Sequence, residues 1–200
     1  MDTLWKERFG GIDRLYGSGA LARLRACHVT VVGIGGVGSW AVEALARSGV
    51  GRLTLIDADD LCVSNTNRQL PALDGQFGRA KIEAMAERCL AINPLVDVEV
   101  VPEFLTGSNL EALLDRGFDL VLDACDSFRS KVEAIAWCRR RKQPVLTVGS
   151  AGATVSGPSA PLPDDGSAAD AADLSQARLI TQRAGAQRLA AAMPHNPLKA

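Results

Sequence analysis

A glycine-rich stretch directly after a run of β-branched residues is the feature that most constrains this fold. Residues 28–32 read HVTVV, which is typical of a buried strand in a parallel sheet. Gly33, Gly35 and Gly38 then fit the pattern G-x-G-x-x-G, and Gly36 adds a fourth glycine. Glycine permits a tight turn and a close approach of phosphate to the backbone, and the N-terminus of a following helix favours an anion. The stretch therefore predicts a nucleotide site; the alternative is a tight strand-to-helix turn without a ligand.

Strand-like and helix-like segments alternate along the first three quarters of the chain. The predicted strands are residues 28–33, 52–57, 96–101, 118–123 and 144–148. The predicted helices are residues 37–48, 78–92, 108–115 and 127–141, the first with Trp40, Ala41, Ala44, Leu45 and Ser48 at helical spacing. This order predicts an α/β fold, a Rossmann-like, doubly wound and mainly parallel sheet with right-handed crossovers. The ligand of such a sheet lies at the carboxyl ends of the strands, where Gly33, Asp57 and Asp123 fall.

Composition divides the chain into three predicted parts. Residues 1–26 read as short helices, residues 27–153 as a nucleotide-binding domain, and residues 154–200 as an atypical C-terminal tail. Prolines and small residues concentrate after residue 150, which predicts a linker at 157–173 and a helix at 174–192. Because the change is abrupt, we expect a truncated or frameshifted copy rather than a native short variant or a divergent tail that still folds.

Bulk properties limit the classes of function. The net charge of −1 gives no global electrostatic reason to expect a nucleic-acid partner, although a local patch stays open. No apolar run approaches a membrane span and the N-terminus lacks signal-peptide character, so a membrane location is not expected. The five cysteines form no C-x-x-C pair, which favours a reducing cytoplasm and argues against structural zinc. A role for Cys125, beside two acids, stays open.

Polar and charged residues follow the predicted strands. Asp57 lies about twenty residues beyond the glycines, where an acid commonly holds a ribose hydroxyl. Residues 57–69 read DADDLCVSNTNRQ, and this polar loop with Arg68 does not suit the apolar surroundings of a nicotinamide. Lys81 and the acids of the sequence DACD, Asp123 and Asp126, complete a set of cations and carboxylates. Such a set suits phosphoryl or nucleotidyl transfer, in which cations and Mg²⁺ neutralise a leaving pyrophosphate.

Each of these residues also has a plainer interpretation. The alternatives are an ion pair of Arg68 with Asp59 or Asp60, an ion pair of Lys81 with Glu87 or Asp74, a strand end without a cap at Asp57, and Asp126 as the N-cap of a helix that begins at Ser127.

Four motifs taken together resemble the ubiquitin-activating-enzyme-like adenylating family (ThiF/MoeB/HesA). They are the glycine motif at Gly33–Ser39, the acids and S-N-x-x-R-Q at Asp57–Gln69, Lys81, and D-x-x-D at Asp123–Asp126. The resemblance runs from about Arg8 to Ala153. Within the family the chain is most similar to the branch that acts on threonylcarbamoyladenosine in tRNA, in the stretches RFGGIDRLYG, SNTNRQ and AWCRRRKQPVLTVGSAG. Relatives that activate sulfur carriers usually show S-N-L-Q-R-Q and two C-x-x-C pairs, which this chain lacks.

The resemblance implies an activity and partners. Residues 27–153 would be an ATP-binding ThiF-type domain that uses ATP and Mg²⁺ to adenylate the threonylcarbamoyl carboxylate. Pyrophosphate leaves, the neighbouring carbamoyl nitrogen closes a ring, and AMP departs with net loss of water. The implied partners are tRNA, a second copy in a homodimer, and a sulfur-transfer protein or cysteine desulfurase. The alternatives are activation of a ubiquitin-like sulfur-carrier protein, an inactive nucleotide-binding fragment, and an NAD-dependent dehydrogenase.

The resemblance also implies a role for each matching residue. Gly33, Gly35, Gly36 and Gly38 would let the backbone approach the nucleotide, Asp57 would hold the ribose, Asn65 and Arg68 would contact the triphosphate, Lys81 would contact the phosphates, and Asp126 would bind Mg²⁺. Arg14 would reach the γ-phosphate from the partner subunit, and Arg8 is also available for this role. The basic run at 139–142 is either a solvated helix end or a contact to the tRNA backbone.

Overall fold

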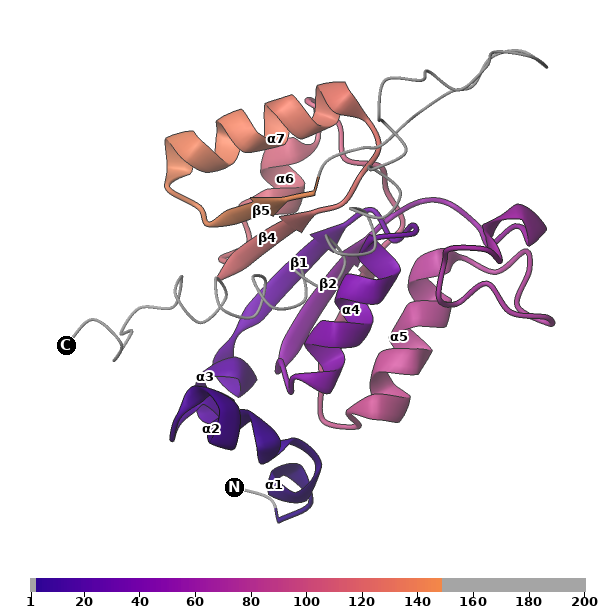
Figure 1. The fold of residues 1–200 in the computed structure, drawn as a ribbon. Coiled ribbons are helices and arrows are strands. Elements are labelled where there is room, and N and C mark those ends of the chain that lie inside the picture. Colours follow the sequence, from indigo (N-terminus) through magenta and orange to yellow (C-terminus); the bar gives the residue numbers. More distant parts are fainter. Residues whose placement is uncertain (1–2, 149–200) are drawn as a thin grey trace, which may run out of the picture. The chain divides into compact units, whose positions relative to one another are not determined.

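The computed structural model describes residues 3–148 (Figure 1). The predicted boundary at residue 153, the linker at 157–173, the helix at 174–192 and the interpretation of the tail all lie outside the described residues. Residues 1–150 make up one compact unit.

Among residues 3–148, five parallel strands make up the sheet, as the alternating pattern predicts. They are β1 (His28–Val32), β2 (Arg52–Ile56), β3 (Asp97–Val101), β4 (Leu120–Asp123) and β5 (Val145–Thr147). Their order across the sheet is β3-β2-β1-β4-β5, so the chain reverses its direction of travel between β1 and β4. In open α/β sheets this reversal opens a crevice at the carboxyl ends of the two central strands.

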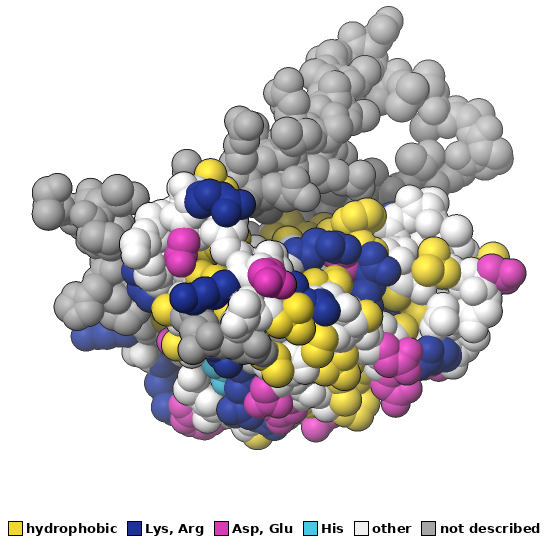
Figure 2. Space-filling view, turned by 90° about the horizontal axis from the view of Figure 1, so that it is seen from below, with side chains coloured by type: hydrophobic (Ala, Val, Ile, Leu, Met, Phe, Trp, Pro, Cys, Tyr) yellow, Lys and Arg dark blue, Asp and Glu magenta, His cyan; other side chains and the backbone are white. Residues whose placement is uncertain are grey.

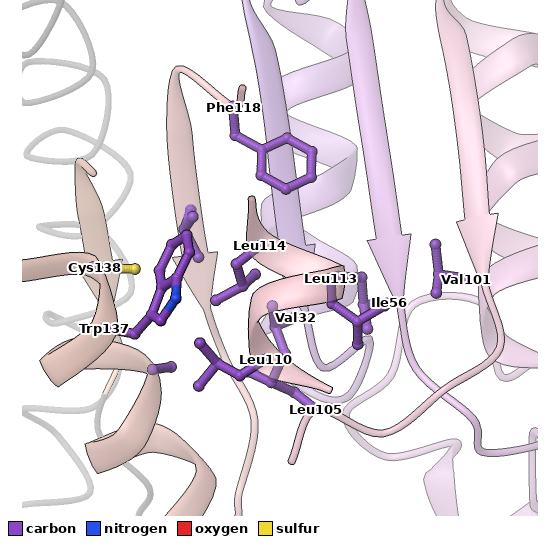
Figure 3. Packing of buried hydrophobic residues seen from close by; sticks show 12 residues of the cluster. Val32, Ile56, Val101, Leu105, Leu110, Leu113, Leu114, Phe118, Trp137 and Cys138 are labelled. Carbon is purple, nitrogen blue, oxygen red and sulfur yellow. The ribbon is translucent and has the colours of Figure 1, made fainter. Parts of the chain in front are cut away.

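Helices cover both faces of the sheet, which confirms the doubly wound α/β class (Figure 1). The helices that follow the first two strands, α4 (Gly38–Arg47) and α5 (Lys81–Ile92), pack on each other and on one face. The other face carries α6 (Leu110–Leu114) and α7 (Phe128–Arg141). Buried apolar side chains fill the second layer, with Leu110, Leu113 and Leu114 of α6 and Trp137 of α7 lying over Val32, Ile56 and Val101 (Figure 3).

The short N-terminal helices are α1 (Thr3–Phe9), α2 (Gly11–Tyr16) and α3 (Ala20–Ala26), and they lie at the end of the sheet where the strands begin (Figure 1). Trp5, Phe9 and Leu21 form their own buried cluster. They pack beneath the end of α4, because a Cβ added at Gly49 would lie 3.1 Å from Leu21 Cδ1 and 3.2 Å from Phe9 Cγ. These helices are therefore anchored at the end opposite to the glycine loop.

All four predicted helices begin later than predicted; the helix expected from residue 37 begins at Gly38, and the one expected from residue 108 begins at Leu110. The helix predicted from residue 78 begins at Lys81, because Gly78 and Arg79 exchange backbone hydrogen bonds with Leu61 instead. The helix predicted from residue 127 begins at Phe128, with Ser127 as its N-cap. Among the described residues no helix is both long and apolar enough to cross a membrane.

Candidate nucleotide-binding site

The four glycines after β1 separate into two structural pairs. Gly33 has φ +84°, and a Cβ there would lie 2.8 Å from the Cα of Cys125. A Cβ at Gly38 would lie 1.7 Å from the carbonyl oxygen of Gly33. The fold itself therefore requires glycine at these two positions.

Gly35 and Gly36 are not required by backbone packing. Among the described residues, a Cβ at Gly35 would meet only Gln69 Nε2, at 3.9 Å, and one at Gly36 would lie 3.2 Å from Arg68 Cγ. Neither residue has a positive φ. Their lack of side chains is explained if a ligand approaches the backbone here, since the same loop leads into the N-terminus of α4.

Asp57 braces the glycine loop from the end of β2. It is 7% exposed, and its Oδ2 accepts a hydrogen bond from the backbone N–H of Ile34 at 2.6 Å. Its Oδ1 accepts the N–H of Asp59 at 2.8 Å. The alternative of a strand end without a cap is therefore wrong. Because a carboxylate offers about four lone-pair sites, Asp57 keeps the capacity to accept from a ribose hydroxyl as well.

Asn65 shapes the loop that carries the predicted phosphate ligands. It ends a short 3₁₀ turn, η1 (Val63–Asn65), and it is 8% exposed. Its Oδ1 accepts the N–H of Cys62 at 2.9 Å, and its carbonyl oxygen accepts the N–H groups of Arg68 and Gln69. The residue thus has a structural task in addition to the contact predicted for it.

Arg68 lies beside the glycine loop, and its guanidinium has no carboxylate partner among residues 3–148. Its stem lies against Gly36, and its Nη1 donates to the carbonyl of Ser64 and to Oδ1 of Asn67, each at 3.0 Å. The indole N–H of Trp40 donates to the Arg68 carbonyl at 3.0 Å, which fixes the backbone. The predicted alternative, an ion pair with Asp59 or Asp60, is not observed. A guanidinium whose charge no carboxylate neutralises suits an anionic phosphate.

Lys81 lies at the first position of α5 and is 6% exposed. Its Nζ donates to Asp59 Oδ2 at 2.7 Å, and its backbone N–H donates to the Asp59 carbonyl at 3.0 Å. The alternative partners, Glu87 and Asp74, are wrong, because Glu87 pairs with Arg79. Asp59 lies in the loop after β2. Its two contacts therefore hold Lys81 at the carboxyl edge of the sheet and not on a solvated helix face.

The loop after β4 crosses the glycine loop at the reversal of strand order. Cys125 packs on Gly33, and the N–H of Ala124 donates to the Val32 carbonyl at 2.8 Å. Asp126 follows and is exposed, with no partner among the described residues. It does not cap α7, because the Ser127 hydroxyl accepts the N–H of Ser130 at 3.3 Å; the alternative N-cap role is therefore wrong.

The described residues contain no group of three or more metal-binding side chains. One free carboxylate, Asp126, still fits Mg²⁺, because this ion usually keeps several waters and is bound by one or two carboxylates together with substrate phosphates. The thiol of Cys125 does not suit a nucleophile. Burial, and then its hydrogen bond with Asp123, raise its pKa to about 12, so it stays protonated at neutral pH.

Arg8 and Arg14 lie at the far end of the unit from the other candidate residues. Arg8 donates to the carbonyl of Ile92, the last residue of α5, at 2.8 Å, and Arg14 is exposed on α2. The ten residues of α4 span about 15 Å between the glycine loop and this end. Figure 2 views the molecule from this side, where Lys and Arg side chains gather near the centre. Neither arginine is placed to reach the glycine loop of its own chain.

The basic run at 139–142 ends α7, next to the start of β5 and thus away from the glycine loop. Arg141 contacts Glu111 and Asp115 and stacks over Trp137, with its Cζ 5.3 Å from the ring centroid. Lys142 adopts the left-handed conformation that ends the helix, with φ 55°. These contacts favour the interpretation as a solvated helix end.

Sequence reasoning missed two residues of the site. Ser39 is fully buried, and its hydroxyl accepts the N–H of Leu70 at 3.2 Å, which ties the polar loop to α4. Lys131 forms a buried ion pair with Asp123. A lysine on an apolar helix face, eight residues after an acid that ends a strand, is the signal that could have identified the pair.

The fold and the site define a class: a doubly wound α/β domain with an anion-binding glycine loop at the reversal of strand order. The sequence profile of the ThiF family matches residues 12–166, and the chain belongs to this family.

Several members of the family are similar to this chain in sequence or in structure. The chain is 54% identical over 148 residues to the tRNA threonylcarbamoyladenosine dehydratase of Haemophilus influenzae, which covers 74% of this chain and 57% of the relative. The crystal structure of the E. coli tRNA N6-threonylcarbamoyladenosine dehydratase in complex with ATP is similar with a TM-score of 0.74 and 52% identity, covering 77% of this chain and 63% of that one. The E. coli molybdopterin-synthase adenylyltransferase is 36% identical over 124 residues, 62% of this chain and 49% of the relative. The chain thus spans about half the length of the curated relatives.

Proposed function

We propose that this protein is an ATP-dependent dehydratase that adenylates the carboxylate of threonylcarbamoyladenosine in tRNA and cyclises it. The observation that carries the proposal is Arg68, a cation without a carboxylate partner among the described residues, held against Gly36 at the glycine loop. The 54% identity to the H. influenzae dehydratase supports this substrate over a carrier protein. The S-N-T-N-R-Q sequence supports the same choice.

Each residue would bind or orient a part of ATP. Asp57 accepts from the ribose, while the exposed backbone at Gly35 and Gly36 admits the phosphates. Arg68 and Lys81 stabilise the negative charge that develops on the leaving pyrophosphate, and losing one such contact typically costs on the order of 100-fold in rate.

The reaction itself needs no covalent enzyme intermediate. A carboxylate oxygen of the substrate attacks the α-phosphorus, and the bond to pyrophosphate breaks. The neighbouring carbamoyl nitrogen then attacks the activated carbonyl and loses its proton, and AMP leaves with one oxygen of the former carboxylate. The net change in the nucleoside is the loss of one water. Asp126 would hold Mg²⁺, which supplies further charge neutralisation at the phosphates when it is bound.

We propose a homodimer in which Arg14 contributes to the site of the partner subunit. The distance between α2 and the glycine loop supports this arrangement, because an exposed arginine at the far end of the unit serves the site only from a second copy. We place the protein in the cytoplasm, where its tRNA substrate is found. Nothing among residues 3–148 argues for the sulfur-transfer or cysteine desulfurase partner, and it is not part of the proposal.

The test is turnover of the full chain with ATP, Mg²⁺ and tRNA that carries uncyclised threonylcarbamoyladenosine. AMP and pyrophosphate release should depend on this tRNA, and mass analysis of the nucleoside should show loss of one water. An Arg68→Ala variant is the control, because its side chain makes no contact that the fold requires. AMP release that depends instead on a carrier protein with a C-terminal Gly-Gly would contradict the proposal, and so would ATP binding without AMP release.

A further inference from the structure

Asp123 and Lys131 form a buried ion pair directly behind the loop that carries Asp126. Asp123 is fully buried at the end of β4, and the Lys131 side chain is 8% exposed. Lys131 Nζ donates to Asp123 Oδ2 at 2.6 Å. Removing one partner of such a pair leaves an uncompensated buried charge, which is why the two residues must be considered together.

Asp123 and Lys131 each form a hydrogen bond with the backbone of the loop between β4 and α7. The second oxygen of Asp123, Oδ1, accepts the N–H of Cys125 at 3.1 Å, and the N–H of Lys131 donates to the carbonyl of Ser127 at 2.9 Å. Lys131 lies one turn into α7, so its side chain reaches back along the helix to the strand from which the loop departs. The residues on either side of Asp126, Cys125 and Ser127, are thereby fixed by hydrogen bonds.

The same loop supports the glycine motif. The Cα and N atoms of Cys125 lie 2.8 Å from the position that a Cβ on Gly33 would take, so the two loops touch through their backbones. A displacement of residues 124–126 would therefore move the glycine loop as well as Asp126.

The two acids of D-x-x-D consequently differ in burial and in hydrogen bonding. Asp123 has one oxygen on a lysine and the other on a backbone N–H, while Asp126 is exposed without a partner among residues 3–148. Because Lys131 occupies one oxygen of Asp123, Asp126 is the acid of this pair that stays available to a cation among residues 3–148.

We infer that Lys131 is a positioning residue: by neutralising Asp123 it fixes the 124–126 loop and makes Asp126 the carboxylate presented to a divalent cation beside the nucleotide. This inference rests on the proposed function, in which ATP binds with Mg²⁺. Lys131 itself touches neither ligand; it acts through Asp123 and the backbone of Cys125.

The test measures ATP binding to the full chain by calorimetry over a range of Mg²⁺ concentrations. Lys131→Met keeps the length of the side chain and removes its charge, and it should raise the half-saturating Mg²⁺ concentration by about tenfold or more, as loss of an outer-shell partner typically does. The double variant Lys131→Met with Asp123→Asn should restore the wild-type value to within about twofold. Its neutral pair leaves no unpaired charge, and the Asn oxygen still accepts the N–H of Cys125. Arg140→Met, which removes an exposed cation from the same helix, is the matched control and should have no effect.

The melting temperature of each variant separates positioning from stability. A purely structural role would lower the melting temperature of Lys131→Met without moving the Mg²⁺ dependence of ATP binding, and that result would overturn the inference. A double variant that binds Mg²⁺ as weakly as Lys131→Met would also overturn it, because the weaker binding would then not come from the unpaired charge of Asp123. Failure of the wild-type chain to bind ATP would overturn the proposed function and this inference together, whereas normal wild-type binding with an unchanged Lys131→Met would overturn the inference alone.

Discussion

Replacing Gly35 by alanine should weaken nucleotide binding while leaving the fold intact. Among residues 3–148, the added Cβ would have Gln69 Nε2 as its one neighbour within 4 Å, at 3.9 Å, and the backbone of Gly35 has no positive φ. A Gly-to-Ala change at such a compatible position typically stabilises a protein by about 0.4–1 kcal/mol, because the unfolded chain loses conformational freedom. In the proposed complex, however, the methyl group would occupy the space into which the phosphates approach.

Gly33→Ala provides the contrast. Its φ of +84° alone should cost an alanine about 1–2 kcal/mol. For a chain of this size, that loss corresponds to a fall in melting temperature of about 2–8 °C. The contact of the new Cβ with the backbone of Cys125, at 2.8 Å, adds to this penalty, because backbone atoms on both sides must move.

Thermal melts and ATP titrations of the two variants distinguish a glycine kept for the ligand from a glycine kept for the fold. Gly35→Ala should melt at or above the wild-type temperature and bind ATP more weakly by about tenfold or more, a loss of about 1.4 kcal/mol. Gly33→Ala should melt lower. Wild-type ATP affinity in Gly35→Ala would refute the reasoning that the phosphates pass over this residue, and so would a melting temperature that falls as far as that of Gly33→Ala.

Arg68→Ala should cut pyrophosphate release by about tenfold or more without lowering the melting temperature, because its guanidinium contacts only a carbonyl and the Asn67 side chain; normal turnover would exclude the transition-state role. Lys81→Ala should lower both turnover and stability, since it leaves Asp59 without its ammonium partner; a variant with unchanged melting would show that this contact contributes nothing to folding. Cys125 should react with a thiol-alkylating reagent far more slowly than the exposed Cys62 at pH 8, because burial and Asp123 raise its pKa to about 12 and the thiolate form accumulates only as the pH approaches that value. Mass spectrometry follows the labelling, and equal rates for both thiols would contradict the buried environment of Cys125.

The sheet and its glycine loop were predictable because local sequence specifies them. Runs such as HVTVV give the strands, and alternation with helices gives the parallel order, which the topology confirms. Helix starts were less predictable. The helix expected from residue 78 begins at Lys81, since Gly78 and Arg79 form backbone hydrogen bonds with Leu61. Leu61 lies in the loop after β2, and helical periodicity does not reveal such a contact.

The partners of charged residues were the least predictable part of the candidate site. The plainer interpretation of Lys81 was an ion pair with Glu87 or Asp74, whereas its partner Asp59 comes from the preceding loop. The buried ion pair of Lys131 escaped attention for the same reason, because its acid ends a strand of another layer. Contacts of this kind depend on how helices and strands pack together, so the sequence of one element does not predict them.

The most direct test of the central claim follows an oxygen atom. The threonyl carboxylate of the tRNA nucleoside is prepared with a heavy oxygen isotope and incubated with the full chain, ATP and Mg²⁺, and the products are separated for mass analysis. If the chain adenylates this carboxylate and then closes the ring, one heavy oxygen appears in AMP and the nucleoside loses the corresponding water. Unlabelled AMP, or label in inorganic phosphate together with ADP, would show that the carboxylate never attacked the α-phosphorus and would contradict the account.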